Sequence, residues 1–537
     1  MSSERELFVL ANPPNQNHLG VIFMFKSKWV IPATLSAALV VSAVPATALQ
    51  AEAKVPTVKK VDVANTLKAT SNYYYSLPDV STPTYQSSDA VLNFARSNYA
   101  VSKDYYTTFY KDVERELKKQ KGQFSGSPGA LSKIILAITA IGKDPKNVAG
   151  YNLINLLGDK LVAGKAAKSL YITDYLYVLR ALEAKGYSFP AGTKYADFSR
   201  KSMVDYLVST QFENGGFSWA EDVENGVSVD MTAMVLSALA NYDSDPAVKA
   251  SIRKGLDYMS SQLTDVAGYS PWGGNSVDSQ AQVVIALTEN GINPKTARSF
   301  IKNGQWAVSN MLLNFDATTG GFKITPDQKS PQLFATTSAM LGLVAYDRYA
   351  SDKNTFFDLT DAKASSLKYD TAAPKSLSVT KVANTTKTIS GTTEPYATVT
   401  IYNGSKKLAA VQADAKGKFS YPVKTAFKAN ATVKFYVTDL ASNKSKAITQ
   451  KVADRLTPAT PKVSKLVKGA KKVTGSTTKG ATVYAKIGNK TYKATANTKT
   501  GSFSIKVPTL KEKTKVKVYA KKSNYTSKSV TVAVKSK

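Results

Sequence analysis

The stretch Gln211–Leu239, QFENGGFSWAEDVENGVSVDMTAMVLSAL, decides the fold because its parts recur along the chain. It has the pattern of a helix end, a turn with two glycines and the start of an apolar helix. A second copy begins about fifty residues later at Gln262, with Gly268 and Tyr269 in the turn, and continues into SVDSQAQVVIAL at 276–287. A repeat of this length is typical of folds built from stacked helix pairs.

Two kinds of helix-forming segment alternate between Ser87 and about Asp361. One kind is apolar on nearly every side and rich in alanine: residues 131–142, 173–186, 229–239, 277–287 and 333–346. The other kind is amphipathic and charged: residues 195–211, 246–262 and 294–312. An all-round apolar helix needs cover on two sides, whereas an amphipathic helix needs cover on one. We therefore predict a closed double ring of five or six helix pairs with the apolar set inside. An open solenoid is the alternative, less favoured because neither end shows a polar-faced capping repeat.

The turn residues carry a resemblance to a known family. The motif consists of Tyr206-Leu207, Gln211, Gly215 and Phe217, and its second copy of Lys254-Gly255, Tyr258-Met259 and Gln262. This pattern resembles the glutamine-and-aromatic repeat of the terpenoid cyclase and protein prenyltransferase superfamily. The resemblance implies an α/α toroid of about six helix pairs over residues 87–362, preceded by an N-terminal segment over 54–86.

The physical role of the motif is structural. A Gln amide at a helix C-terminus can satisfy free carbonyls, the Gly permits a left-handed turn, and the aromatic side chain packs under the next inner helix. Ser228 and Ser276 stand where N-caps belong. Asp230 and Asp278 follow two residues later, in the electropositive first turn of the next helix.

The last third of the chain changes to short alternating runs rich in Thr, Val and Lys. ISGTTEPYATVTIYNG at 389–404 matches VTGSTTKGATVYAKIGN at 473–489, and Gly391 and Gly475 are 84 residues apart. Each copy has about seven strand-length runs. We predict two all-β modules, 371–456 and 457–537, which resemble the small immunoglobulin-like domains of bacterial surface proteins.

The N-terminal 53 residues have the features of a leader. From Met24 the chain has two lysines, an apolar run and then small residues, which is the order found in a secretory signal peptide. We expect translation to begin at Met24, cleavage after Ala48 or Ala53, no membrane span after cleavage, and secretion. The chain has no cysteine, and its one histidine, His18, precedes Met24.

Positive charge is concentrated in the β modules. Of the net charge of +32, residues 371–537 carry +29, divided into +10 for the first module and +19 for the second. For an exported protein we predict anionic cell-wall polymers as the partner and no nucleic acid, since aromatic residues for base stacking are sparse. A solubilising surface is the alternative.

The chemistry of the resembled superfamily is not supported by the residues present. Class II cyclases use an acidic run of the form DxDDTA, and the corresponding residues 228–233 keep only one carboxylate, Asp230. Protein prenyltransferases bind zinc through Asp, Cys and His, and the mature chain would lack both Cys and His. We therefore expect no catalytic residues, no metal and no cofactor. A cobalamin-like ligand remains an alternative, because a toroid followed by β domains resembles the domain order of the cobalamin carriers of the transcobalamin type. No specific residue supports it.

A ligand site at one end of the ring is the remaining prediction. The loops before two inner helices supply Trp219, Glu221 and Asp222 in one repeat and Trp272 in the next, and aromatic side chains beside carboxylates suit a sugar ring. These residues, with Asp230 and Asp278, are the candidate ligand contacts. The structural interpretation, which we prefer, is solvated acidic turns and first-turn acids.

The sequence thus predicts a non-catalytic secreted protein. Its toroid binds a small molecule or glycan, and its basic β modules associate with the cell wall. The alternative is an enzyme that acts on a polyisoprenoid or a polysaccharide at the mouth of the toroid.

Overall fold

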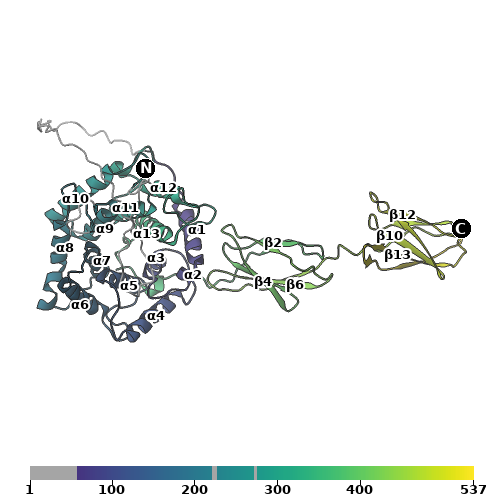
Figure 1. The fold of residues 1–537 in the computed structure, drawn as a ribbon, viewed down its shortest axis with the longest axis horizontal. Coiled ribbons are helices and arrows are strands. Elements are labelled where there is room, and N and C mark those ends of the chain that lie inside the picture. The colour runs from purple at the N-terminus through teal and green to yellow at the C-terminus, as the bar shows by residue number, and fades with distance from the viewer. Residues whose placement is uncertain (1–56, 220–225, 271–274) are drawn as a thin grey trace, which may run out of the picture. The chain divides into compact units, whose positions relative to one another are not determined.

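The computed structural model describes residues 57–219, 226–270 and 275–537. Two concentric rings of helices come first (Figure 1). The outer helices are α1 (Val63–Ser76), α4 (Tyr105–Lys119), α6 (Leu153–Ala166), α8 (Arg200–Ser209), α10 (Pro246–Ser261) and α12 (Ala307–Met311). The inner helices are α3 (Ser88–Arg96), α5 (Pro128–Ala140), α7 (Ile172–Glu183), α9 (Val229–Leu239), α11 (Val277–Glu289) and α13 (Leu333–Ala350). A short helix, α2 (Pro78–Ser81), follows α1.

The inner helices run parallel to one another. At one end Asp174 in the first turn of α7 accepts a hydrogen bond from Gly129 N in the first turn of α5, at 2.9 Å. At the other end the amide of Asn290, which ends α11, donates to Leu236 O near the end of α9. Helix α13 packs against both α11 and α3, so the ring closes on itself. The predicted double ring of helix pairs is confirmed, and the open solenoid is not.

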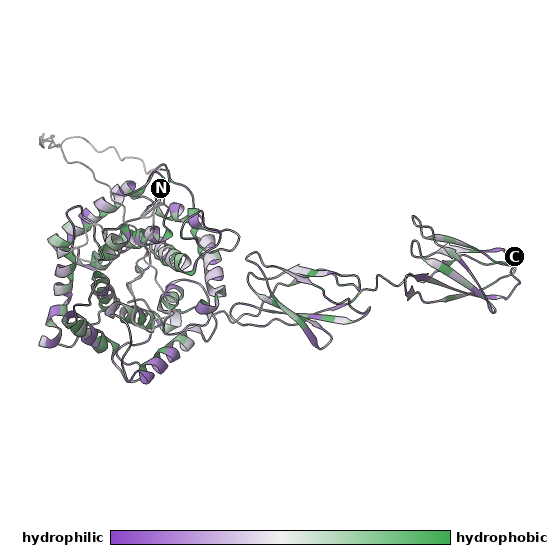
Figure 2. Ribbon diagram, viewed as in Figure 1, coloured by the Kyte–Doolittle hydropathy of each residue, from purple (hydrophilic) through white to green (hydrophobic). Residues whose placement is uncertain are grey.

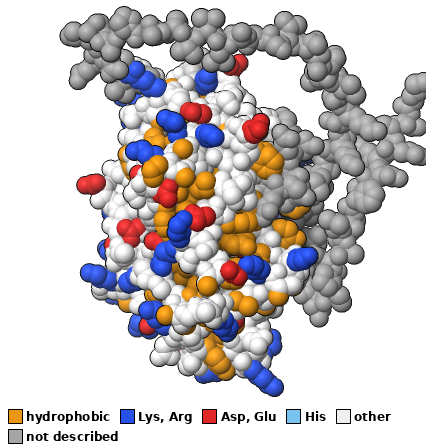
Figure 3. All heavy atoms as spheres, turned by 90° about the vertical axis from the view of Figure 1, so that its left-hand side faces the viewer, with side chains coloured by type: hydrophobic (Ala, Val, Ile, Leu, Met, Phe, Trp, Pro, Cys, Tyr) orange, Lys and Arg blue, Asp and Glu red, His pale blue; other side chains and the backbone are white. Residues whose placement is uncertain are grey.

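Burial explains the two rings. Helix α11 has buried residues on all its sides, from Val277 to Thr288, whereas α10 buries one stripe around Val248, Ile252 and Met259. Figure 2 shows the same difference as mostly hydrophobic inner helices and outer helices with hydrophilic sides. The face that carries α8 and α10 mixes charges of both signs with exposed apolar side chains (Figure 3).

The predicted helix over 294–312 is wrong as a continuous element. The structure has only a 3-10 turn at Arg298–Phe300 and the short α12 there. Asn303 and Gly304 between them have φ of 49° and 73°, which a helix cannot contain. Three α-helices of the described chain were not foreseen: α6, and both α1 and α2 within the N-terminal segment. The Tyr74 hydroxyl of α1 accepts a hydrogen bond from Thr337 of α13 at 3.1 Å.

The C-terminal end of the inner ring is covered by the chain that follows α13. Phe356 in this segment is fully buried, and Leu359 N donates to Ala184 O just after α7, at 2.8 Å. Arg96, the last residue of α3, donates to the carbonyls of Thr355 and Asp358. The segment therefore contacts the ends of inner helices on several sides of the ring.

Two antiparallel β modules follow, each with its own apolar core. In the first, one sheet has the order β1-β2-β5 and the other β4-β3-β6-β7. Its strands are β1 (Ser378–Val379), β2 (Thr388–Thr392), β3 (Thr398–Asn403), β4 (Lys406–Gln412), β5 (Lys418–Pro422), β6 (Thr432–Thr438) and β7 (Ile448–Lys451). In the second, the orders are β12-β9-β8 and β11-β10-β13, with β14 and β15 paired to β13. Its strands are β8 (Lys462–Val463), β9 (Lys472–Ser476), β10 (Thr482–Ile487), β11 (Lys490–Thr495), β12 (Ser502–Lys506), β13 (Lys515–Lys522), β14 (Tyr525–Thr526) and β15 (Val530–Ala533).

Candidate functional site

The repeated turn has the structural role predicted for it in its first copy. The amide of Gln211 donates to Gly215 O at 2.8 Å and to Ser251 O of α10 at 2.9 Å. Gly215 has φ +88°, and a Cβ there would lie 2.4 Å from Lys254 O. Phe217 is fully buried. The motif therefore joins the end of α8 to the neighbouring outer helix.

The second copy differs from the prediction. The Gln262 side chain is exposed and donates only to Ser261 Oγ, and the left-handed residue is Ala267, with φ 55°. Gly268 instead permits a close approach, because a Cβ there would lie 2.0 Å from Asn275 Oδ1. The Gln280 amide donates to Ala267 O at 2.9 Å, and Asn310 and Asn303 donate to the neighbouring carbonyls of Val266 and Asp265, so side chains other than Gln262 hold this turn.

The turns bring two acids to the N-terminal rim, by which we mean the N-terminal ends of the six inner helices. Ser228 Oγ accepts from Met231 N at 3.2 Å and Ser276 Oγ from Ser279 N at 3.3 Å, so both predicted N-caps are confirmed. Asp230 and Asp278 thereby occupy the second position of α9 and α11.

The environment of these acids is not that of solvated first-turn residues. Burial, and then the negative charge of Asp278, raise the pKa of Asp230 to about 7. Burial also raises the pKa of Asp278, whose Oδ1 accepts a hydrogen bond from Ser338 Oγ of α13 at 2.5 Å. Within the described chain, Asp230 Oδ1 is buried without a hydrogen bond of good geometry, and the nearby Ser279 hydroxyl of α11, itself without such a bond, lowers the Asp230 pKa only in part against burial. An electropositive helix start should lower the pKa of a nearby carboxyl, so burial outweighs it here.

Two tyrosines flank Asp230. Burial and then the charge of Asp230 raise the pKa of Tyr269 and of Tyr258 from the usual value. Among described residues the buried Tyr269 hydroxyl, too, has no partner. A carboxyl oxygen and a phenol hydroxyl are thus both unsatisfied in one small region of the rim, and such groups normally find a partner.

A cation lies on the other side of the ring. Lys133 of α5, which faces α11 across the inner ring in Figure 1, contacts Asp89 Oδ2 of α3 at 3.0 Å. Its Nζ also lies 5.0 Å from the centre of the Tyr177 ring of α7. The positive charge of Lys133 reaches Asp278 and lowers its pKa, against the effect of burial. Among the described residues, the first turns of the inner helices supply four carboxyls, Asp89, Asp174, Asp230 and Asp278, and Lys133 is the ammonium group that affects two of them.

Exposed aromatic residues complete the rim. Tyr171, the N-cap residue of α7, is 54% exposed, and Trp219, before α9, is 42% exposed, with their ring centres 6.4 Å apart. Phe334 in the first turn of α13 is 60% exposed. Large apolar side chains left open beside polar groups are characteristic of a contact surface.

Sequence reasoning found part of this site. Trp219, Asp230 and Asp278 lie on the rim as predicted, while Glu221, Asp222 and Trp272 fall outside the described residues. Lys133, Asp89, Ser338 and Phe334 were missed. For Asp89 a signal existed, because it follows a serine at a helix start as the other two acids do.

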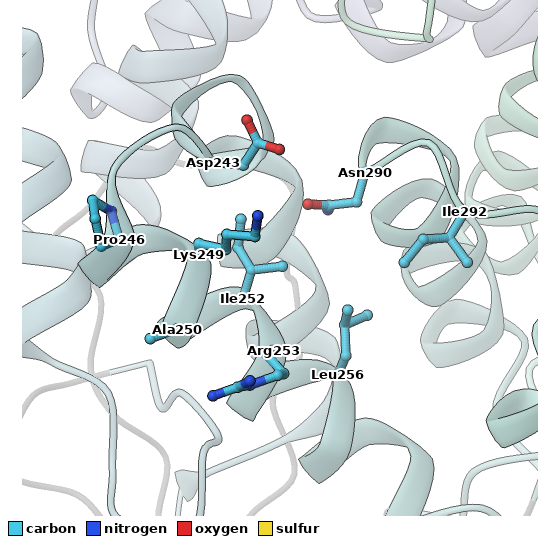
Figure 4. Close-up of a pocket in the computed structure, with 9 residues that line it drawn as sticks. All are labelled: Asp243, Pro246, Lys249, Ala250, Ile252, Arg253, Leu256, Asn290 and Ile292. Atoms are coloured by element: carbon cyan, nitrogen blue, oxygen red, sulfur yellow. The ribbon is translucent and has the colours of Figure 1, made fainter. Parts of the chain in front are cut away.

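A separate pocket of about 420 Å³ lies on the outside of the ring (Figure 4). Lys249, Arg253 and Leu256 of α10 line one side, and Asn290 and Ile292 the other. The Asn290 amide is already used, donating to Ala286 O at 2.8 Å and to Leu236 O. None of the predicted contacts lies there.

Comparisons with known proteins agree with the two-part architecture. Residues 373–454 match the family model described as a bacterial Ig domain. A search of curated proteins gave no match to the chain. No helix of the described residues has the length and apolar character needed to cross a membrane.

Solved structures resemble both parts. A variant of a type II terpene cyclase from Scytonema is 12% identical, with a TM-score of 0.35, over 53% of this chain and 97% of that one. A variant of unsaturated glucuronyl hydrolase from Streptococcus agalactiae is 10% identical, with a TM-score of 0.39, over 56% and 95%. A BSP domain of a biofilm-associated protein is 16% identical, with a TM-score of 0.15, and only 30% of each chain is covered. TM-scores this low carry no conclusion about either fold or chemistry. The chain is an α/α toroid followed by Ig-like β domains, of which residues 373–454 are a bacterial Ig domain.

Proposed function

We propose that the protein is a surface-associated binding protein whose toroid holds a polyhydroxylated ligand, such as a glycan, at the N-terminal rim. The observation that carries the proposal is the half-buried Asp230, whose buried Oδ1 has no hydrogen-bond partner among the described residues and which lies next to a second acid. A neutral ligand rich in hydroxyls can donate to this oxygen without adding charge. The bacterial Ig domain supports surface association, and the net charge of +29 supports the cell wall as its location.

The aromatic residues favour a glycan over a small ion. Tyr171, Trp219 and Phe334 present flat apolar surface beside carboxyls and the Ser338 hydroxyl. Sugar rings have an apolar face and a hydroxyl edge, so the rim offers a contact for each.

Binding can be tested with the secreted full-length chain and a panel of soluble glycans that includes fragments of bacterial wall glycan. We expect a ligand whose affinity falls at least tenfold in Asp230→Asn, measured by calorimetry. Asp243→Asn is the matched control, because Asp243 is an exposed acid just beyond the other end of α9. Equal affinities in both variants would contradict the proposal.

Catalysis is the second candidate, and one observation favours it. The run at 228–233 lacks the neighbouring carboxylate of a strong acid, but Asp278 of the next inner helix lies close enough to affect the pKa of Asp230. A carboxyl with a pKa near 7 is half protonated at neutral pH and suits general acid chemistry on a polysaccharide or polyisoprenoid. If Asp230→Asn still binds the ligand but no longer converts it, the protein is an enzyme and Asp230 takes part in the reaction. If no ligand is converted by the wild-type protein, catalysis is excluded.

A further inference from the structure

One face of the second β module combines lysines with a stacked aromatic pair. Alternation along β10 and β13 places Val483, Ala485, Val516 and Val518 in the core, so the intervening residues point outward. We call the outward side chains of this sheet the Lys–Tyr face: Tyr484, Lys486, Lys493, Lys515, Lys517, Tyr519 and Lys521.

The two tyrosines form the centre of the Lys–Tyr face. Tyr484 and Tyr519 stand directly opposite each other on adjacent strands, with ring centres 5.0 Å apart and planes within 8° of parallel. Lys521 Nζ lies 5.6 Å and 6.0 Å from the two ring centres. Lys493 is the partner of Tyr484 on the other neighbouring strand. A flat aromatic platform is therefore flanked by ammonium groups on both sides.

Two lysines of this face repel each other without compensation. Lys486 and Lys517 are directly opposite on β10 and β13. Like charges in this position destabilise a sheet, by roughly 0.2–1 kcal/mol. Within the described chain no lysine of residues 457–537 forms an ion pair, and Glu512 is the single acid of that module. An anion bound between the two lysines would remove the repulsion.

The first β module provides a comparison within the same chain. Its equivalent sheet pairs Tyr402 of β3 with Lys434 of β6, so no like-charge pair arises there. Its two aromatic residues, Tyr402 and Tyr436, meet edge to face at 82° and not as a stack. The Lys–Tyr face is therefore a property of the second module, not of the fold.

We infer that the Lys–Tyr face binds a phosphodiester-linked polymer of the cell wall. Outward residues on one strand are about 7 Å apart, so Lys515, Lys517 and Lys521 of β13 form a row that can follow successive phosphates. The tyrosine platform can contact the sugar or polyol between them. A nucleic acid fits less well, because successive bases would each need an aromatic ring to stack on and the Lys–Tyr face presents a single tyrosine pair.

This inference rests on the surface association in the proposed function and locates it. The experiment measures binding of the full chain to isolated cell walls, before and after chemical removal of their phosphodiester polymers. Lys493→Gln, Lys517→Gln and Lys521→Gln together form the face variant. The matched control changes Lys462, Lys472 and Lys506 to Gln on the opposite sheet of the same module, removing the same charge from exposed positions. Lys472 and Lys506 are also directly opposite each other, so the control includes a like-charge pair that has no tyrosine pair beside it. Circular dichroism verifies that both variants fold.

We expect the face variant to bind intact walls about tenfold more weakly, with a salt dependence reduced by two to three ion contacts. The control should change affinity by less than about threefold, because charges on the opposite sheet lie beyond a Debye length of about 8–10 Å from a polymer on the Lys–Tyr face and are screened from it. Equal losses in both variants would overturn the inference, as would wild-type binding that survives polymer removal or a face variant impaired only toward single-stranded DNA. If the wild-type protein does not bind walls at all, the surface association itself fails, which is a distinguishable result.

Discussion

The two ends of the inner ring use charged residues in opposite ways. At the C-terminal end Arg96 and Arg348 both contact Asp361 at 2.5 Å, and Glu289 accepts hydrogen bonds from Thr355 Oγ and Phe357 N. At the N-terminal rim Asp230 keeps an unpartnered oxygen within the described chain. Charged groups that the protein satisfies itself stabilise the structure, whereas the carboxyl oxygen left unsatisfied at the rim is the ligand contact that we propose.

The stability of the protein should be more sensitive to mutation at the C-terminal end of the inner ring than at the N-terminal rim. Asp361→Asn leaves two buried guanidinium groups without their counter-ion, and breaking such a pair costs about 3 kcal/mol of the free energy of unfolding. Urea denaturation at pH 7 measures the loss. Asp205→Asn is the control, because its ion pair with Lys201 is exposed and should contribute less than about 0.5 kcal/mol.

Asp361 should also make the free energy of unfolding depend on pH. Although burial alone raises the pKa of Asp361, contacts with Arg96 and Arg348 outweigh it and lower the pKa overall. Its stabilisation is therefore complete above the pKa of the unfolded chain, about 4, and is lost as the pH falls through the folded value. The difference in stability between the wild type and Asp361→Asn, measured at the same pH, should therefore shrink as the pH falls below about 4. A difference that stays constant down to acid unfolding would contradict this assignment.

At the N-terminal rim, removing the charge of Asp230 should raise stability, whereas removing that of Asp361 lowers it. The folded pKa of Asp230, about 7, lies above that of an unfolded Asp, so the ionised form destabilises the fold as pH rises from about 4 to 7. Asp230→Asn should therefore stabilise the protein at pH 8 by about 1–3 kcal/mol and leave its stability unchanged at pH 4. A loss of stability at pH 8 would place Asp230 among the structural residues, with Asp361.

Periodicity predicted the rings but not what they bring together. The all-round apolar pattern of residues 277–287 identified an inner helix, because burial on every side leaves that signature in the residues themselves. The contact of Lys133 with Asp89, and the reach of its charge to Asp278, depend on the register of helices from different repeats. Tertiary packing sets that register, and no local pattern encodes it.

Tertiary packing also explains why the sequence predicted an isolated carboxyl at 228–233. Counting acids along one run finds Asp230 alone, while the neighbour that affects its pKa is 48 residues further along the chain. The broken segment around Asn303 and Gly304 was missed for a local reason. Its apolar spacing resembles a helix, but two consecutive residues with positive φ interrupt it.

The exposed aromatic residues sharpen the contrast between ligand binding and stability. Trp219→Ala and Phe334→Ser should each weaken glycan binding at the rim about tenfold while changing the free energy of unfolding by less than about 0.5 kcal/mol, because exposed side chains support little packing. Ile448→Thr, an exposed apolar position in the first β module, is the control and should change neither. Loss of stability in step with affinity would show that these aromatic residues belong to the packing of the ring.

The smallest expected effect separates the two copies of the turn that leads into the rim. Gln211→Ala removes the donor that satisfies Gly215 O and Ser251 O, so unfolding should become easier by about 1 kcal/mol. Gln262→Ala removes only an exposed contact with Ser261 and should have no measurable effect. Neither should alter glycan affinity, because both amides face backbone or solvent and not the acids of the rim. Equal destabilisation by the two substitutions would mean that the repeated glutamine acts through helix propensity and not through its amide. A selective loss of binding in Gln211→Ala would instead show that the turn also positions Asp230.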